Sequence, residues 1–432
     1  MKNNLFFISF ICTTFLCAQI KINGKVLNSA NLPLENVTIY LNNTSIGTVT
    51  NKLGEFELSI NEGIYDLVIS YMGYETLKYK INTSTYAESL KFYLKPALNL
   101  LDETIIKSKR YSAEDMAYFL SRFKMSFIGE TQLAENCKIL NPDVIKFDFD
   151  LPSKTLEAYA NKPIEIENKD LGYKIYYELL DFVLTNETIV YSGYSRYETL
   201  RGGKRKKNYW RQNRLKAYNG SKMHFVRSAI LGTLHKEGFV IDQSKKVLNP
   251  HRPADSVINA ARERFRWLKK NSSKKLKTRN FKIKTRLSNK RNTVNSKGNS
   301  FLKIFKPDSI SEKEIDTLMT LLKKRRLKKF IDIKLNEDLN EDAFLVKSNN
   351  EVRLKFEYQL DIKYINEAEE DGYRPGPGKL NYQESKLTLL TESVLLDKTG
   401  IFNNEASTVF TYGYWSYERI ADALPLNFIP VN

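Results

Sequence analysis

Cysteine is scarce in this chain of 432 residues, which contains three: Cys12, Cys17 and Cys137. The first two lie in an N-terminal segment that we expect to be removed, so only Cys137 remains in the mature chain. A single cysteine cannot form an internal disulfide, and stability must therefore come from packing. We expect Cys137 to be a small buried hydrophobic side chain rather than a nucleophile.

Histidine is equally rare, and its three positions, His224, His235 and His251, exclude the usual zinc peptidase patterns. None begins a His-x-x-Glu pair, and no His-Glu-x-x-His occurs. Ser221 and His224 share a helix face, but no oxyanion-hole motif or placed acid accompanies them. Glycine-rich phosphate loops are also missing, because the segment 201–204 (RGGK) lacks the Walker spacing. We therefore predict no metal, no cofactor and no catalytic residue, with a hydrolase kept as the alternative.

Long apolar runs are absent after the N-terminus. Leu5 to Leu16 is apolar and follows Lys2, which is typical of a signal peptide over residues 1–18. This run is too short for a bilayer, which requires about 20 residues. Two alternatives stay open: a buried N-terminal element, and a lipoprotein anchored through Cys17, although Leu16 occupies the position where a lipobox has a small residue. No transmembrane helix is expected after cleavage.

Aromatic residues, by contrast, are plentiful, with 25 Tyr and 24 Phe, and they favour sheets. Residues 20–96 alternate apolar and polar side chains with period two between turn residues. About seven short strands in this span predict a β-sandwich, since each strand has one apolar face to bury. Gly54 and Gly73 are expected at turns that require a positive φ.

The same span also resembles a known family through four short motifs: Gly24-Lys25-Val26, then 32–37 (LPLENV), then 47–56 (GTVTNKLGEF), then 69–74 (ISYMGY). In this order they are similar to the carboxypeptidase regulatory-like domain, a transthyretin-like β-sandwich found at the start of exported proteins of the Bacteroidota. The resemblance implies no peptidase, because the zinc site of true metallocarboxypeptidases lies in a separate domain.

In outer-membrane transporters the same sandwich precedes a plug and a large barrel, and the join resembles residues 100–106 (LLDETII). The roughly 325 residues that follow here are too few for that architecture. The resemblance therefore implies an exported protein of the periplasm or outer-membrane surface, with an outer-membrane protein as a possible partner.

The remainder, residues 111–432, predicts an α+β domain with a mainly antiparallel sheet. A helix is expected after Ser112 and Asp115, and strands near Val144, Ile164 and Tyr173. The span 206–234 reads as helical with a break at Gly220. Asp255 could cap a further helix, and Ser311 with Glu314 forms a capping-box pattern.

Two pairs of segments resemble each other, 168–179 with 349–360 and 188–200 with 408–420. The second pair shares Gly-Tyr-x-x-Tyr-Glu. Chance likeness among Tyr-rich strands is the alternative to a duplicated strand unit, whose two halves would pair into one sheet or barrel. The aromatic side chains of this motif are candidate ligand-binding residues or, alternatively, core: Tyr194, Tyr197, Tyr414, Trp415 and Tyr417.

Positive charge is concentrated in residues 201–330, which hold 38 Lys and Arg against 8 Asp and Glu. We expect a helical or flexible basic insertion over about 250–330, with 271–300 the most polar part. A solvated face is one interpretation and a polyanion contact the other. The candidate polyanion-binding residues are Lys204, Arg205, Lys206, Lys207, Arg325 and Arg326. No nucleic-acid motif occurs, so an envelope glycan or phosphate polymer is the expected partner.

The sequence thus predicts a non-enzymatic, exported, envelope-associated binding or assembly protein. The alternatives are a hydrolase of envelope glycans or peptides and an accessory component of an outer-membrane uptake system.

Overall fold

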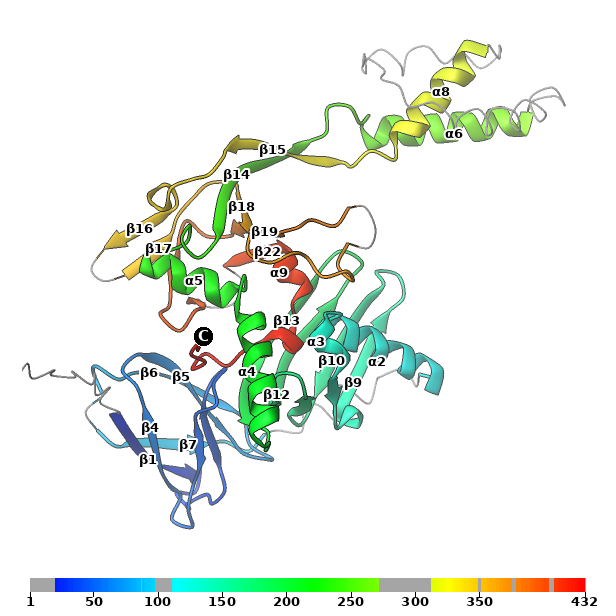
Figure 1. Cartoon of the computed structure of the whole chain (residues 1–432). Coiled ribbons are helices and arrows are strands. Elements are labelled where there is room, and N and C mark those ends of the chain that lie inside the picture. The colour runs from blue at the N-terminus through cyan, green and yellow to red at the C-terminus, as the bar shows by residue number, and fades with distance from the viewer. Residues whose placement is uncertain are drawn as a thin grey trace, which may run out of the picture. The chain divides into compact units, whose positions relative to one another are not determined.

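The computed structural model describes residues 20–86, 88–97, 111–271, 312–348, 351–374, 378–403 and 408–431 (Figure 1). The proposed signal peptide with Cys17, the 100–106 join and the polar stretch 272–300 lie outside these residues. The chain forms two compact units. The second comprises Asp242–Leu339 with Glu357–Leu360, and the first comprises the rest. Helices and antiparallel sheets occur together, so the predicted α+β class is confirmed.

The first unit begins with the predicted β-sandwich. One sheet has the order β4-β1-β7 and the other β3-β2-β5-β6. The seven strands are β1 (Ile20–Asn28), β2 (Thr38–Leu41), β3 (Gly47–Val49), β4 (Glu55–Ile60), β5 (Ile64–Ser70), β6 (Leu77–Asn82) and β7 (Leu90–Leu94).

Period-two alternation explains this fold. In β4 the side chains of Phe56, Leu58 and Ile60 are buried while their neighbours are exposed. They join one core with residues such as Val26 from the other strands. The predicted turn glycines are also confirmed, because Gly54 has a φ of 74° and Gly73 a φ of 81°.

A six-stranded sheet follows, in which β12 is the central strand. The path β8-β11-β12-β10-β9 describes five strands, and β13 pairs with β12. The strands are β8 (Cys137–Ile139), β9 (Ile145–Asp150), β10 (Thr155–Ala160), β11 (Ile164–Asn168), β12 (Tyr173–Leu184) and β13 (Ile189–Thr199). The short α3 (Gln132–Glu135) and η1 (Pro142–Val144) flank β8.

Helix α2 (Ala113–Phe127) supplies the aromatic core of this sheet, through Phe119, Phe123 and Phe127. Its start is the predicted capping box, in which Asp115 N–H donates to the Ser112 side chain. Cys137 is buried in the same core, and burial raises its thiol pKa to about 12, consistent with an inert hydrophobic role.

Two helices then follow, with the break near Gly220 that the sequence predicts: α4 (Lys204–Tyr218) and α5 (Lys222–Leu231). The rest of the first unit holds a sheet of order β16-β17-β20-β21 and the paired strands β19 and β22. The elements of this part of the chain are η3 (Glu341–Ala343), β16 (Leu345–Ser348), β17 (Glu351–Leu354), β18 (Gln359–Tyr364), β19 (Gln383–Leu389), β20 (Val394–Leu396), β21 (Phe402–Asn403), β22 (Val409–Gly413), α9 (Tyr414–Tyr417) and η4 (Ile420–Asp422). Strand β18 belongs to the first unit from Asp361 onward.

The second unit is an antiparallel ribbon and a helix pair. The ribbon joins residues 243–248 of β14 (Phe239–Leu248) to β15 (Phe330–Asn336). Helices α6 (Asp255–Asn271) and α8 (Glu312–Lys324) pack through Ala261, Leu268 and Leu318. Asp255 begins α6 as expected, whereas Ser311 lies outside the described residues. Among those residues, no helix combines the length and apolarity needed to cross a membrane.

The predicted strand duplication is wrong in its pairing. Strand β13 pairs with β12 and β22 pairs with β19, so the two similar segments do not build one sheet. The shared Gly-Tyr-x-x-Tyr sequence is a strand in β13 but a helical turn in α9. The reason is local: Gly413 has a φ of 74° and ends the strand before Tyr414.

The sandwich is bonded to the six-stranded sheet and to the C-terminal segment. Asn43 N–H donates to the Ser195 carbonyl over 2.7 Å, and Leu426 N–H donates to the Asn43 carbonyl over 2.7 Å. Buried Tyr40 donates its hydroxyl to Glu178 over 2.9 Å, and Thr76 donates to the same carboxylate over 2.8 Å. The first domain is thus part of a larger compact unit.

Candidate anion-binding pocket

Helix α4 is fastened to the turn between β11 and β12. Trp210, which is buried, donates its indole N–H to the Lys169 carbonyl over 2.9 Å. Tyr209 donates to the Asp170 carboxylate over 2.9 Å. Gly172, with a φ of 67°, lies against the Trp210 ring so closely that an added Cβ would overlap it. The middle of the helix is therefore held against this turn.

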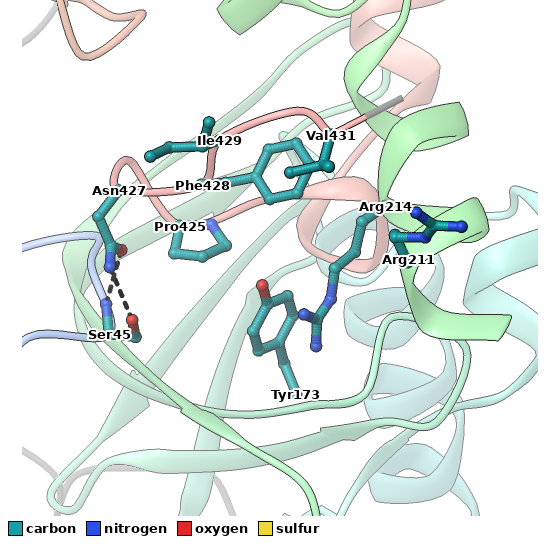
Figure 2. A pocket seen from close by; sticks show the side chains of 9 residues that line it. All are labelled: Ser45, Tyr173, Arg211, Arg214, Pro425, Asn427, Phe428, Ile429 and Val431. Atoms are coloured by element: carbon teal, nitrogen blue, oxygen red, sulfur yellow. Dashed lines mark hydrogen bonds between the residues drawn. The ribbon is translucent and has the colours of Figure 1, made fainter. Parts of the chain in front are cut away.

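A pocket of about 280 Å³ lies beside this helix (Figure 2). Arg211 and Arg214 come from α4, and Tyr173 comes from the start of β12. The other lining residues are Ser45 from the sandwich and Pro425, Asn427, Phe428, Ile429 and Val431 from the C-terminal segment. None of the lining residues is acidic, so the pocket combines two cations with apolar and aromatic walls.

Arg214 is held as a fixed cation. Its Nε donates to the Leu171 carbonyl over 2.7 Å and its Nη2 to the Gly172 carbonyl over 3.2 Å. The guanidinium lies 3.9 Å from the centroid of the Tyr173 ring, a cation–π contact. Burial lowers the pKa of Arg214. An arginine nevertheless stays charged in proteins, so this half-buried site carries a permanent positive charge.

Within the described residues, no carboxylate forms an ion pair with Arg214 or with exposed Arg211. The Asn427 side chain closes one side of the pocket instead. It donates to Ser45 Oγ over 2.8 Å and accepts from Ser45 N–H over 3.0 Å (Figure 2). Two guanidinium groups without an acidic partner, beside a small cavity, are suited to an oxyanion.

The pocket ends a basic stripe. Helix α4 carries seven Lys and Arg and no acidic residue. Lys204, Lys207, Arg211 and Arg214 recur at intervals of three and four, which places them on one side of the helix. The first turn, with four cations, also lies at the positive end of the helix dipole. This charge arrangement disfavours the helix, and a bound anion would relieve it.

The predicted polyanion-binding residues fall into two groups. Lys204, Arg205, Lys206 and Lys207 are exposed on the first turn of α4 and belong to the stripe or flank it. Arg325 and Arg326 are exposed after α8, in the second unit. Their binding role stays a prediction. Sequence reasoning missed Arg211, Arg214 and Tyr173, although the spacing 204, 207, 211, 214 was visible in the sequence.

The predicted aromatic ligand residues do not form one group. Tyr194 lies on β13 opposite Glu178, while buried Tyr197 packs edge-on against Tyr173. Trp415 is buried, contacts Phe225 and donates its indole N–H to the Gly220 carbonyl over 2.7 Å, as a core residue does.

The remaining two tyrosines, Tyr414 and Tyr417, cluster with Tyr373, and Tyr417 donates to the Glu130 carbonyl over 2.8 Å. None of the five lines the arginine pocket.

The Ser221–His224 pair is structural. Ser221 Oγ accepts the backbone N–H of His224 as the N-cap of α5 and donates to the Tyr218 carbonyl. The imidazole Nδ1 accepts the Gly220 N–H over 3.1 Å, and burial lowers its pKa. Neither side chain activates the other. In the part of the chain that the structure describes, no group of three or more His, Cys, Asp or Glu is arranged to hold a metal ion.

Comparison with known proteins places the relationships in the first domain. Residues 22–106 match the family model of the CarboxypepD_reg-like domain, which confirms the predicted resemblance. A TonB-dependent receptor of Formosa agariphila is 31% identical over 102 residues, which is 24% of this chain and 9% of the receptor. The chain thus matches a small part of that relative's length.

Among solved structures, a 9R-lipoxygenase from Cyanothece is 13% identical, and the match covers 49% of this chain and 48% of the lipoxygenase chain. Its TM-score of 0.15 means that the likeness carries no information about the fold.

Proposed function

We propose that this chain is an exported, cell-envelope-associated binding protein without enzymatic activity, and that α4 binds a polyanionic envelope polymer. The single observation that carries the proposal is the pair Arg211 and Arg214, which line a pocket without an acidic partner among the described residues. The basic stripe that leads to this pocket extends the contact beyond one anionic group.

The chemistry of the stripe favours repeated oxyanions. A guanidinium group presents its N–H donors in a planar fork that fits carboxylate, sulfate and phosphate groups. Successive turns of α4 are about 5.4 Å apart, so its cations can meet successive charges of an extended polymer. The aromatic and apolar walls of the pocket suit the face of a sugar ring better than a bare inorganic ion.

The compartment is proposed from three observations that agree. The first 18 residues have the pattern of a signal peptide, the first domain matches the CarboxypepD_reg-like model, and the similar receptor is TonB-dependent. Together they support an exported protein at the periplasmic side or the outer-membrane surface.

The test is binding of the mature full-length protein to polygalacturonate and to polyphosphate, measured by calorimetry at several salt concentrations. We expect saturable binding that weakens with salt through counterion release. Arg211→Gln with Arg214→Gln should reduce the slope of log affinity against log salt by about two, roughly one per lost contact. Lys80→Gln with Lys162→Gln removes the same charge from exposed positions elsewhere and should leave the slope within experimental error.

Two outcomes would overturn the proposal. One is the absence of saturable binding to either polymer, and the other is an equal loss of affinity in both double variants, which would indicate nonspecific charge attraction. If the polymer is shortened during incubation, as size-exclusion chromatography would reveal, the chain acts as a hydrolase and the non-enzymatic part is wrong.

A second candidate is an accessory role in an outer-membrane uptake system, and the similarity to a TonB-dependent receptor favours it. In that case the sandwich would contact an outer-membrane protein partner. Crosslinking in cells followed by mass spectrometry tests this: a receptor crosslinked to residues 20–97 supports the role, and crosslinks confined to other parts of the chain contradict it.

A further inference from the structure

A larger cavity, of about 450 Å³, lies elsewhere in the first unit. Strands β12 and β13 supply tyrosines, the start of α5 supplies Lys222, and the segment after α9 supplies Glu418, Arg419 and Asp422. We call this the Lys222 cavity. Its other lining residues used below are Tyr177, Tyr191, Tyr197, Met223, Ile401 and Leu424.

Lys222 and Glu418 are the two charged groups of this cavity without a direct partner. In the described part of the chain, neither side chain makes an ion pair or a side-chain hydrogen bond, and they do not pair with each other. The Lys222 side chain is exposed at the mouth of the cavity, whereas Glu418 is partly buried. Burial raises the pKa of Glu418. Two groups of opposite sign thus line one cavity without forming an ion pair with each other.

The other two charged residues are already engaged. Asp422 accepts from Thr131 Oγ1 over 2.9 Å and from the Arg419 N–H over 3.3 Å. Arg419 in turn faces the partly buried Tyr191, and its charge opposes the rise in that phenol's pKa. These contacts fix the segment that presents Glu418, so the position of the free carboxylate is set before any ligand arrives.

We propose that the Lys222 cavity is a second binding site, specific for a small zwitterion such as a free amino acid or a short peptide with free termini. The carboxylate of the ligand pairs with Lys222 and its ammonium group pairs with Glu418. The site differs in chemistry from the arginine pocket, which has only positive charge. It does not depend on the function proposed above.

The volume and the walls agree with this ligand class. A cavity of about 450 Å³ lies within the range of small-molecule sites. Met223, Ile401 and Leu424 offer an apolar surface for a ligand side chain or methylene groups, while the tyrosine hydroxyls can donate to or accept from a peptide group. An anion alone would leave Glu418 unpaired, and a cation alone would leave Lys222 unpaired.

The experiment is calorimetric titration of the mature full-length protein with glycine, glutamate, alanyl-alanine, N-acetyl-alanyl-alanine and alanyl-alanine amide. We expect saturable binding of at least one zwitterion. Lys222→Gln and Glu418→Gln should each weaken it about tenfold or more, as the loss of a charged hydrogen-bond partner does. The acetylated dipeptide lacks the cation, and the dipeptide amide lacks the carboxylate. Each should therefore bind the wild-type protein about as weakly as alanyl-alanine binds the Lys222→Gln and Glu418→Gln variants.

The controls separate binding from folding. Lys236→Gln and Glu187→Gln change exposed residues of the same types and should leave binding unchanged. Lys222→Arg keeps the charge and should keep binding, which a purely structural role of the lysine amine would not predict. The proposal is overturned if no zwitterion binds saturably, if the acetylated dipeptide binds as well as its zwitterion, or if both glutamine variants bind like the wild type.

Discussion

The Arg214 guanidinium lies over the Tyr173 ring, 3.9 Å from its centroid, while its Nε donates to the Leu171 carbonyl over 2.7 Å. The ring and the carbonyl hold the cation from two directions, so little side-chain entropy remains to be lost when an anion binds. Arg211, one helical turn earlier, is exposed and has no such support. The two arginines should therefore differ in what their loss costs.

We predict that Arg214→Met destabilises the protein by about 1–3 kcal/mol, because the Leu171 carbonyl loses its buried donor. Arg211→Met should change stability by less than about 0.5 kcal/mol, as exposed substitutions do. Denaturant unfolding measures both values. Equal stability losses in the two variants would contradict the fixed-cation interpretation.

We predict a larger cost for Gly172→Ala. Its φ of 67° is unfavourable for alanine, and the added Cβ would overlap the Trp210 ring. We expect a loss of at least about 2 kcal/mol, since a positive φ alone costs roughly 1–2 kcal/mol. Gly378→Ala is the matched control, because a Cβ there meets nothing within 4 Å. A Gly172→Ala variant with the same thermal midpoint as this control would argue against the helix–turn contact.

We predict that Glu178→Leu loosens the sandwich. The change removes the acceptor of the buried Tyr40 hydroxyl, and a buried unsatisfied donor costs about 1–3 kcal/mol. Adding Tyr40→Phe should recover part of this loss, because the buried hydroxyl that lacks an acceptor is then removed. The recovery is partial because Thr76, the second donor to Glu178, still loses its acceptor. Hydrogen exchange of residues 38–41 reports the effect. No recovery in the double variant would mean that the carboxylate acts through another contact.

We predict that stability falls with rising pH through the titration of Asp422. Burial raises its pKa from 3.8 to about 7, so the folded state binds this proton more tightly than the unfolded state does. Its contribution to stability is therefore full below pH 3.8 and is lost as the pH rises to about 7. Asp422→Asn should flatten this part of the curve, as thermal midpoints across that range would reveal. An unchanged curve in the variant would assign the decline to other groups.

Local patterns predicted most elements of the fold because each depends on neighbours in sequence. The alternation of Phe56, Leu58 and Ile60 defines β4, and Ser112 with Asp115 defines the start of α2. The sequence similarity between β13 and the segment around α9 led to the wrong expectation of two paired strands, because that similarity is also purely local. A local motif carries no record of the backbone turn at Gly413, where the φ of 74° redirects the chain.

The candidate site was predicted only in part. The cluster Lys204 to Lys207 is visible in the sequence as a run of charge. The role of Arg214 is not visible there, because its guanidinium is held by a turn more than 40 residues earlier and its pocket is completed by the C-terminal segment. Of the residues that line the Lys222 cavity, Tyr197 was among the predicted ligand-binding residues, but the charged groups Lys222 and Glu418 were not predicted. Lys222 and Glu418 are almost 200 residues apart, and no periodicity links them.

The bonds from Asn43 to both Ser195 and Leu426 have a practical consequence for anyone who divides this protein. If the sandwich were expressed alone, the loop around Asn43 would lose both hydrogen-bond partners and become exposed on one side. A chain shortened before Leu426 would lose one of these two hydrogen bonds. Fragments expressed separately should therefore be unstable or aggregate, whereas co-expressed fragments should be able to associate with each other.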